Sequence, residues 1–177
     1  MKWITRRSAH VDRTACPWLI KKLIDPDAEF VFVAPDVDPT TLDGHTFDMR
    51  GAEYAHEDGK CTFQVMLERH GLCGDPALVE LGRIIGDADV PPSRTRRHES
   101  AGLDALMRGF QLGVPDDHEK LRLTGPMYDA LYTYCYAKVA QPRAPGGAPR
   151  PKLRYAQRVA SHLDDDRIEV HRTTVRC

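Results

Sequence analysis

The first 33 residues predict a strand, a helix and a second strand in succession, and this order constrains the fold more than any other feature. Residues 2–5 are a short strand candidate, and residues 12–24 carry the broad apolar face of a helix. Asp25-Pro26 ends that helix because the residue before a proline is pushed out of the helical region. Residues 29–33, Glu-Phe-Val-Phe-Val, then indicate a buried strand.

Beyond this opening the chain is mainly helical in pattern. A loop over residues 34–44 and a short strand near 46–49 precede three stretches with helical periodicity, which are 62–70, 76–85 and 99–112. A last long helix is expected after Pro115, with Asp116 and Glu119 at capping-box spacing and a break at residues 124–126. At 177 residues the chain can bury one sizeable core. We therefore expect a helix-rich, mixed α/β domain in which several helices pack on a small sheet.

The charge is unevenly distributed along the chain. The formal net charge is -1, but residues 138–177 carry nine Lys/Arg against four Asp/Glu, which leaves the preceding body at about -6. We divide the chain into a domain at residues 1–137 and a basic tail at 138–177. The tail starts with a Pro/Gly-rich linker at 141–149, followed by a helix candidate at 153–163 and a strand candidate at 168–171. The acidic body is a poor nucleic-acid surface, whereas contact with DNA or an acidic partner remains open for the tail.

Two classes of location are disfavoured by composition. No stretch approaches the ~20 apolar residues of a membrane span, and the N-terminal Met-Lys-Trp-Ile-Thr-Arg-Arg lacks the apolar region of a secretory signal. A cytoplasmic protein follows by elimination. The five cysteines are an odd number at wide spacings, and no C-x-x-C pair indicates a zinc knuckle or a dithiol motif.

Cys16-Pro17-Trp18 is the first candidate for chemistry. Pro17 is tolerated best in the first turn of a helix, which predicts that Cys16 lies at a helix N-terminus capped by Asp12 or Thr14. Backbone N–H groups at that end lower a thiol pKa and favour a nucleophilic or redox cysteine, so Cys16 is a candidate catalytic residue. The alternative is a buried cysteine that packs beside Trp18.

The same helix start is a candidate oxyanion site formed by Arg13 and His10. A helix terminus contributes only ~0.3–2 kcal/mol toward an anion, so arginines, further backbone donors or a metal must supply most of the affinity. Arg13 is therefore also a candidate catalytic residue. Asp12 repels an anion unless it pairs with Arg13, and its alternative role is to cap the helix.

Histidines and carboxylates form a second candidate site. His56, Glu99, Asp117 and His118 offer the imidazole and carboxylate mixture that suits iron, manganese or zinc. Three protein ligands would leave room for water or substrate. Neither His98-Glu99 nor His118-Glu119 completes an H-E-x-x-H protease motif. Each residue also has a simpler role, because acidic residues in first helical turns complement the helix dipole and a loop histidine is commonly solvated.

Several motifs together resemble a known family. The chain is similar over residues 2–137 to the C-terminal domain of the chromate-resistance protein family ChrB. The resemblance rests on these segments: Lys2-Trp-Ile-Thr-Arg, Val11-Asp-Arg-Thr-Ala-Cys-Pro-Trp-Leu-Ile, Ile24-Asp-Pro-Asp-Ala-Glu-Phe, Phe47-Asp, the His56 loop with Cys61-Thr-Phe, Ala88-Asp, Pro115-Asp-Asp-His-Glu and Tyr128-Asp-Ala-Leu-Tyr.

The resemblance implies an association with chromate resistance, as a chromate-responsive regulator or an accessory detoxification factor. Full-length relatives carry a further N-terminal region, which is a candidate for the regulatory role. Glu99 fits an acidic position of the family. The other polar positions that match the family pattern are Asp12, Arg13, Cys16, Asp48, His56, Cys61, Asp89, Asp117 and His118.

Residues and resemblance together predict a protein that handles or senses chromate and related oxidative stress. We expect a transition metal on His56, Glu99 and His118, with Asp117 or Asp89 assisting. Asp12, Asp48 and Cys61 would orient these ligands through hydrogen bonds without binding the metal themselves. Chromate or a similar oxyanion is the expected small-molecule partner, and a metal-dependent oxidoreductase is one form of this function. The alternatives are a non-catalytic regulatory or binding module and a thiol redox enzyme with Cys16 as its single cysteine. Homo-oligomerisation is left open.

Overall fold

Three parallel strands form the sheet, in the order β2-β1-β3. The computed structural model describes residues 1–90 and 97–140. Strand β1 (Lys2–Arg6) is central, β2 (Glu29–Val33) pairs with all five of its residues, and β3 (His45–Thr46) pairs with Trp3 and Ile4. Trp3 and Ile4 are buried, as expected for apolar residues of a strand with neighbours on both sides. The two predicted strands at the start of the chain are confirmed.

Helix α1 (Val11–Leu19) connects β1 to β2 and continues into a π-helical turn, η1 (Ile20–Ile24). The predicted helix is present, but its predicted start is wrong. His10 is the N-cap residue, so Pro17 lies inside α1 and Cys16 lies beyond the first turn. Burial explains this placement, because nearly every residue of α1 is buried and tertiary packing outweighs the ~3 kcal/mol cost of an internal proline.

Four further α-helices follow, and the predicted helical stretches match them closely. Two of them begin at a capping aspartate: Asp75 accepts hydrogen bonds from Ala77 N and Leu78 N, and Asp116 does the same for the amides of residues 118 and 119. The remaining elements are η2 (Pro39–Thr41), α2 (Thr62–Arg69), η3 (Leu72–Gly74), α3 (Pro76–Asp89), α4 (His98–Gly113) and α5 (Asp117–Val139).

Helix α5 continues through Pro126, so the predicted break at residues 124–126 is wrong. The proline lacks the N–H that would continue the hydrogen-bond ladder. Thr124 and Tyr128 on either side of it are fully buried, and their packing holds the two halves of the helix in line. Continuity matters for the site because Tyr128 donates a hydrogen bond to Val11 O at the start of α1.

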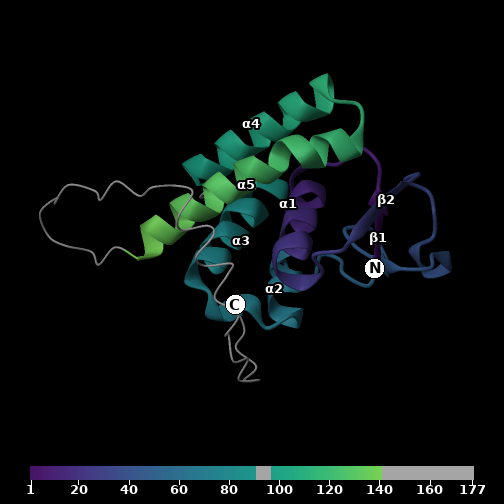
Figure 1. Cartoon of the computed structure of the whole chain (residues 1–177), viewed down its shortest axis with the longest axis horizontal. Helices are drawn as coiled ribbons and strands as arrows, with labels where there is room; N and C mark the ends of the chain where they lie inside the picture. The colour runs from purple at the N-terminus through teal and green to yellow at the C-terminus, as the bar shows by residue number, and fades with distance from the viewer. Residues whose placement is uncertain (91–96, 141–177) are drawn as a thin grey trace, which may run out of the picture.

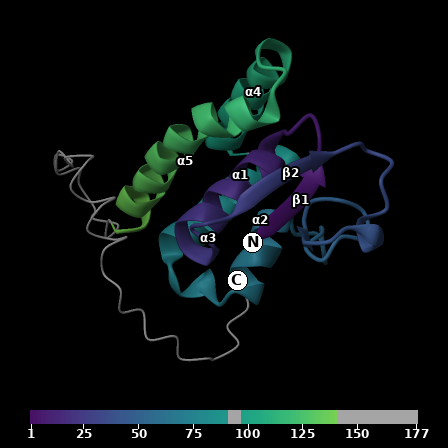
Figure 2. The same ribbon diagram turned by 45° about the vertical axis from the view of Figure 1, so that its right-hand side comes forward.

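The helices lie on one side of the sheet, and α4 and α5 cross α1 and α3 as a further layer (Figures 1 and 2). The core between these layers contains buried aromatic and aliphatic side chains, among them Trp3, Phe47, Phe63, Leu81 and Tyr128. This arrangement confirms the mixed, helix-rich α/β fold. No helix in the described ranges combines the length and apolarity required to traverse a bilayer. The linker, helix and strand predicted beyond residue 140 lie outside the described residues.

Candidate functional site: a histidine and carboxylate cluster beneath an arginine-lined pocket

Four residues from four parts of the chain bring their side chains together at one point. Asp12, Asp48, His56 and Asp89 each place one potential ligand atom within 4.8 Å of the others. His56 Nε2 lies 3.4 Å from Asp12 Oδ2, 3.2 Å from Asp48 Oδ1 and 3.2 Å from Asp89 Oδ2. Such close spacing of three carboxylates favours a shared cation, either the imidazolium or a metal ion, or the protonation of one carboxyl group.

Asp12 is fully buried, and the start of α2 determines its orientation. The backbone N–H groups of Thr62 and Phe63 donate to Asp12 Oδ2 and Oδ1 at 2.5 and 3.1 Å. These N–H groups have no partner within their own helix, so the carboxylate caps α2 from another helix. The expectation that Asp12 caps its own helix or pairs with Arg13 is therefore wrong.

Close packing of α2 on α3 brings those N–H groups to Asp12. A Cβ atom added to Gly82 in α3 would lie only 3.3 Å from the Gln64 and Leu67 side chains of α2. Glycine therefore permits a helix separation that a larger residue would increase. The start of α2 and the end of α3 meet beside Asp12 as a result.

Asp89 is the last residue of α3, and its Oδ1 accepts a hydrogen bond of 3.4 Å from Asp12 N. The C-terminal end of a helix carries partial negative charge, which adds to the preference of the cluster for a cation. Asp48 follows Phe47 with a left-handed φ of 48°, and Thr62 Oγ1 donates to its Oδ1 at 3.1 Å. The loop after β3 and the start of α2 thus hold the same carboxylate.

A two-residue turn presents His56 to the three carboxylates. Asp58 and Gly59 both have positive φ, and Glu57 and Lys60 exchange backbone hydrogen bonds of 2.9 and 3.2 Å across them. Asp-Gly is a favoured sequence for this type of turn because both central residues need left-handed conformations. His56 directly precedes this turn and is 44% exposed, so one side of its ring faces solvent.

The three carboxylates strongly favour the charged form of His56. Hydrogen bonds to Asp12, Asp48 and Asp89 raise the pKa of His56 from 6.5 to about 12. Burial raises the pKa of Asp12 from 3.8 to about 6, although its contact with His56 opposes that change. In the absence of a metal ion the imidazolium is therefore the cation that balances the cluster.

A pocket of about 570 Å³ opens over the cluster. Asp48, His56 and Asp89 line its acidic side, while His10 and three arginines, Arg6, Arg13 and Arg50, line other parts of it. The Nε atoms of Arg6 and Arg13 are buried and have no hydrogen-bond acceptor among the residues that the structure describes. Arg13 Nε lies 3.2 Å from Asp48 Oδ2, but the poor direction of its N–H makes this contact electrostatic only. Unused guanidinium donors are suited to a tetrahedral oxyanion.

His10 lies beside this pocket in a mostly neutral state. Its Nε2 is 3.5 Å from Asp104 Oδ1, and burial lowers the pKa of its imidazole. A neutral imidazole can donate one hydrogen bond to an anion without adding a charge. The structure therefore places both predicted oxyanion residues, Arg13 and His10, at the same pocket.

The two cysteines nearest the cluster are buried free thiols. Cys16 Sγ lies 3.7 Å from Asp12 Oδ1, and Cys61 is the N-cap residue of α2. Burial raises the pKa of both thiols well above the usual range, and the nearby Asp12 carboxylate adds to the effect. This environment favours the protonated thiol, which is the opposite of what a nucleophilic cysteine needs.

The structure brings two of the five predicted metal ligands, His56 and Asp89, into the cluster and places the other three elsewhere. Glu99 accepts hydrogen bonds from Tyr134 Oη and Lys138 Nζ, which join α4 to α5. Asp117 accepts from the backbone of Ser8 and Ala9 and from buried Lys120. His118 lies against Phe32, with ring centroids 5.1 Å apart. The residues that complete the cluster are Asp12 and Asp48, for which the sequence predicted only supporting roles.

Sequence reasoning missed Arg6 and Arg50 at the pocket. Arg6 ends strand β1, and Arg50 follows the short strand β3. Arg6 lies at the C-terminal end of a parallel strand and Arg50 a few residues beyond one, and α/β proteins commonly bind ligands at this edge of the sheet. Their position at the ends of predicted strands could therefore have identified both arginines as candidate binding residues.

Comparison with known proteins gives a consistent assignment. The family model described as ChrB, C-terminal domain, matches residues 3–135, which include every residue of the cluster. A curated relative, Protein ChrB of Cupriavidus metallidurans, is 37% identical over 133 residues. These residues are 75% of this chain but only 40% of the relative, so the chain spans less than half of that protein's length. No solved structure matches the chain significantly.

Proposed function

The chain belongs to the ChrB C-terminal domain family. We propose that it is a metal-binding domain that handles or senses chromate, or a similar oxyanion, as part of chromate resistance. The observation that carries the proposal is the position of Asp12, Asp48, His56 and Asp89 within 4.8 Å of one another, beneath unused arginine donors.

The donor set selects the kind of metal. Three carboxylates and one imidazole are hard to intermediate ligands, which suit manganese(II) or iron(II). Structural zinc sites are commonly rich in cysteine sulfur, which this cluster lacks. Hydrogen bonds from Thr62 and Phe63 orient Asp12, and Thr62 Oγ1 orients Asp48. Supporting bonds of this kind fix ligand positions in metal sites. A bound metal would supply positive charge and an open coordination position facing the pocket.

The metal and the anion would bind in a coupled manner. Without a metal ion, the carboxylates of Asp12, Asp48 and Asp89 repel a divalent oxyanion that enters the pocket. A divalent metal ion that displaces the His56 proton would reduce the net charge of the cluster from about -2 to about -1, so Arg13 and Arg50 would attract the anion more effectively. Each ligand would then strengthen the binding of the other by the same factor. Such coupling is a basis for sensing, because the domain would bind the oxyanion tightly only when the metal ion is bound.

A thiol enzyme based on Cys16 has less support. Cys16 is fully buried, and both burial and Asp12 raise the pKa of its thiol. Its contact with Asp12 Oδ1 is compatible with a packing residue beside the cluster. We therefore place the chemistry on the cluster and the arginines. Regulation through the tail concerns residues that the structure does not describe.

Metal binding tests the first half of the proposal. Calorimetric titration of the metal-stripped full chain with manganese(II) should give one equivalent, and saturation should raise the melting temperature. Asp89→Asn and His56→Ala should each lower the affinity at least about tenfold, since each removes a ligand. Glu99→Gln and His118→Ala are matched controls outside the cluster and should leave it unchanged. Equal losses in all four variants, or no binding of manganese, iron or zinc by the wild type, would refute the site.

Anion binding tests the second half. Chromate should bind the manganese-loaded protein more tightly than the stripped protein, and Arg13→Gln should weaken that binding about tenfold or more, because hydrogen bonds to charged groups contribute ~1.5–3 kcal/mol. Arg83→Gln, on the exposed face of α3, is the matched control. Binding of chromate that is equally strong without the metal would contradict the coupling while leaving the metal site intact.

A further inference from the structure

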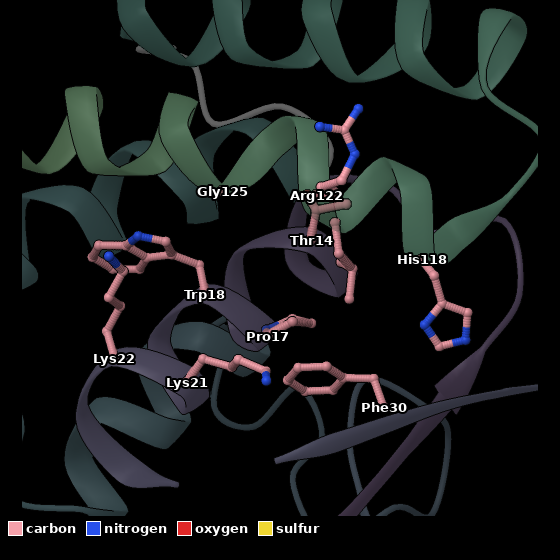
Figure 3. A pocket seen from close by; sticks show the side chains of 10 residues that line it. Thr14, Pro17, Trp18, Lys21, Lys22, Phe30, His118, Arg122 and Gly125 are labelled. Carbon is pink, nitrogen blue, oxygen red and sulfur yellow. The ribbon is translucent and has the colours of Figure 1, made fainter. Parts of the chain in front are cut away.

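A second pocket, of about 490 Å³, lies between α1, η1, β2 and α5 (Figure 3). None of its lining residues lines the pocket over the carboxylate cluster. Its volume falls within the ~300–1,000 Å³ typical of small-molecule sites. The proposed metal and oxyanion functions do not use it.

Rigid apolar surfaces form much of its wall. Pro17, Trp18, Phe30 and Leu121 line it, and Figure 3 shows Pro17, Trp18 and Phe30 arranged around the space. Trp18 is held in place because its Nε1 donates to Asp129 Oδ1 at 2.9 Å. Its ring also packs against two tyrosine rings of α5, with centroids 5.9 and 6.3 Å away. A fixed aromatic wall favours a planar apolar ligand at low entropic cost.

Within residues 1–90 and 97–140, the charged residues of this pocket leave one cation, Lys21, without a partner. Lys22 Nζ pairs with Asp129 at 3.1 Å, and the Arg122 guanidinium donates two hydrogen bonds to Glu119. Lys21 is exposed and makes neither a hydrogen bond nor an ion pair with any residue in the described part of the chain. Figure 3 shows its side chain extending toward Phe30. The pocket therefore combines an apolar wall with one uncompensated ammonium group.

We propose that this pocket binds a small organic anion with a planar apolar body and a single carboxylate or sulfonate group. The planar body would occupy the space between Trp18, Pro17 and Phe30, and the anionic group would pair with Lys21. One free ammonium group matches one negative charge. A neutral ligand would gain no ion pair with Lys21, and a multiply charged inorganic ion would gain nothing from the aromatic wall.

Gly125 provides a way to close this pocket without disturbing the helix. It lines the pocket from α5, and a Cβ atom added to it meets nothing within 4 Å. Gly125→Leu should place a side chain in the pocket while improving the helix propensity of α5. Gly109→Leu, at an equally open position in α4, is the matched control.

The test uses the full chain and the fluorescent probe 8-anilinonaphthalene-1-sulfonate, which has a planar aromatic body and one sulfonate. The wild type should bind one equivalent, Gly125→Leu should abolish binding, and Gly109→Leu should retain it, with melting temperatures of both variants no lower than that of the wild type. Lys21→Gln should weaken binding about tenfold, as expected for loss of a charged hydrogen bond, whereas Lys2→Gln should not. The neutral analogue N-phenyl-1-naphthylamine should be insensitive to Lys21→Gln. Unchanged binding by Gly125→Leu, or equal effects of the two lysine variants, would overturn the proposal.

Discussion

At the scale of single residues, the ion pair between Asp117 and Lys120 fixes the loop that precedes His10 and α1. Lys120 is 2% exposed, and its Nζ lies 2.7 Å from Asp117 Oδ1. Asp117 also accepts hydrogen bonds from the amides of Ser8 and Ala9, directly before His10 and α1. The pair therefore anchors the segment that leads into the pocket from a helix distant in sequence.

Removing this anchor should be costly. Asp117→Ala leaves Lys120 buried without a counter-charge, and breaking a buried pair on one side typically costs about 3–5 kcal/mol of unfolding free energy. Asp116→Ala removes only the exposed helix cap and should cost about 1 kcal/mol. Urea denaturation of the two variants and the wild type gives both values. Similar losses for the two variants would mean that the buried pair has no special structural role.

Residue patterns predicted the site only in part, for a physical reason. Glu99 and Asp117 lie in first helical turns, where acidic residues have local roles. In the structure Glu99 joins α4 to α5, and Asp117 binds the loop before α1. The cluster instead joins residues as far apart as Asp12 and Asp89. Spacing along the chain carries no information about such an approach, because it depends on how α1, α2 and α3 pack.

At the scale of elements, the turn after His56 can be altered by a substitution that changes only the local backbone. Gly59 has a φ of 76°, and an added Cβ atom would meet nothing within 4 Å. A β-branched residue there is strained by its backbone conformation alone, with no steric contact to confuse the result. The turn therefore allows the position of His56 to be changed without repacking the core.

Gly59→Val should destabilise this turn by roughly 1–2 kcal/mol, the cost of a left-handed conformation for a residue with a side chain. His56 would then spend less time facing the carboxylates, and manganese affinity should fall about tenfold. Gly102→Val, at a similarly open position in α4, is a control for the loss of glycine itself. Titration of both variants with manganese(II) measures the affinity of each. An undiminished affinity in Gly59→Val would show that the turn does not position His56.

The sequence predicted most elements correctly because their signals are local. Asp75 and Asp116 cap α3 and α5 as helix-start residues do, and β2 has the predicted bounds. The errors fell on Pro17 and Pro126, which both lie inside helices. Local rules end a helix at a proline, whereas burial of the flanking residues holds these helices together, and burial depends on the whole fold.

At the scale of the whole molecule, the site lies where separate parts of the fold meet. Asp12 comes from α1, Asp48 and His56 from the segment after β3, and Asp89 from the end of α3, while α2 supplies the donors that orient two of them. A metal ion bound there should stabilise the whole folded state, because its ligands come together only when these parts of the fold are packed. Stability and metal affinity should therefore depend on the same variable, the protonation of the cluster.

Metal binding should become stronger as pH rises from 6 to 8. The pKa of His56 is raised to about 12, so the imidazole is protonated throughout this range and the metal must displace its proton. The dissociation constant should therefore fall about tenfold for each pH unit near pH 8, where calorimetry in buffers of different ionisation enthalpy should register about one proton released, from His56. Near pH 6 the release should be larger, because the pKa of Asp12 is about 6 and part of its carboxyl population is protonated. The stabilisation that protonated His56 gives the metal-free protein is fully present below pH 6.5 and is lost progressively as pH rises through about 12. The increase in melting temperature caused by manganese should consequently be larger at pH 8 than at pH 6. An affinity independent of pH, without proton release, would exclude His56 as a ligand.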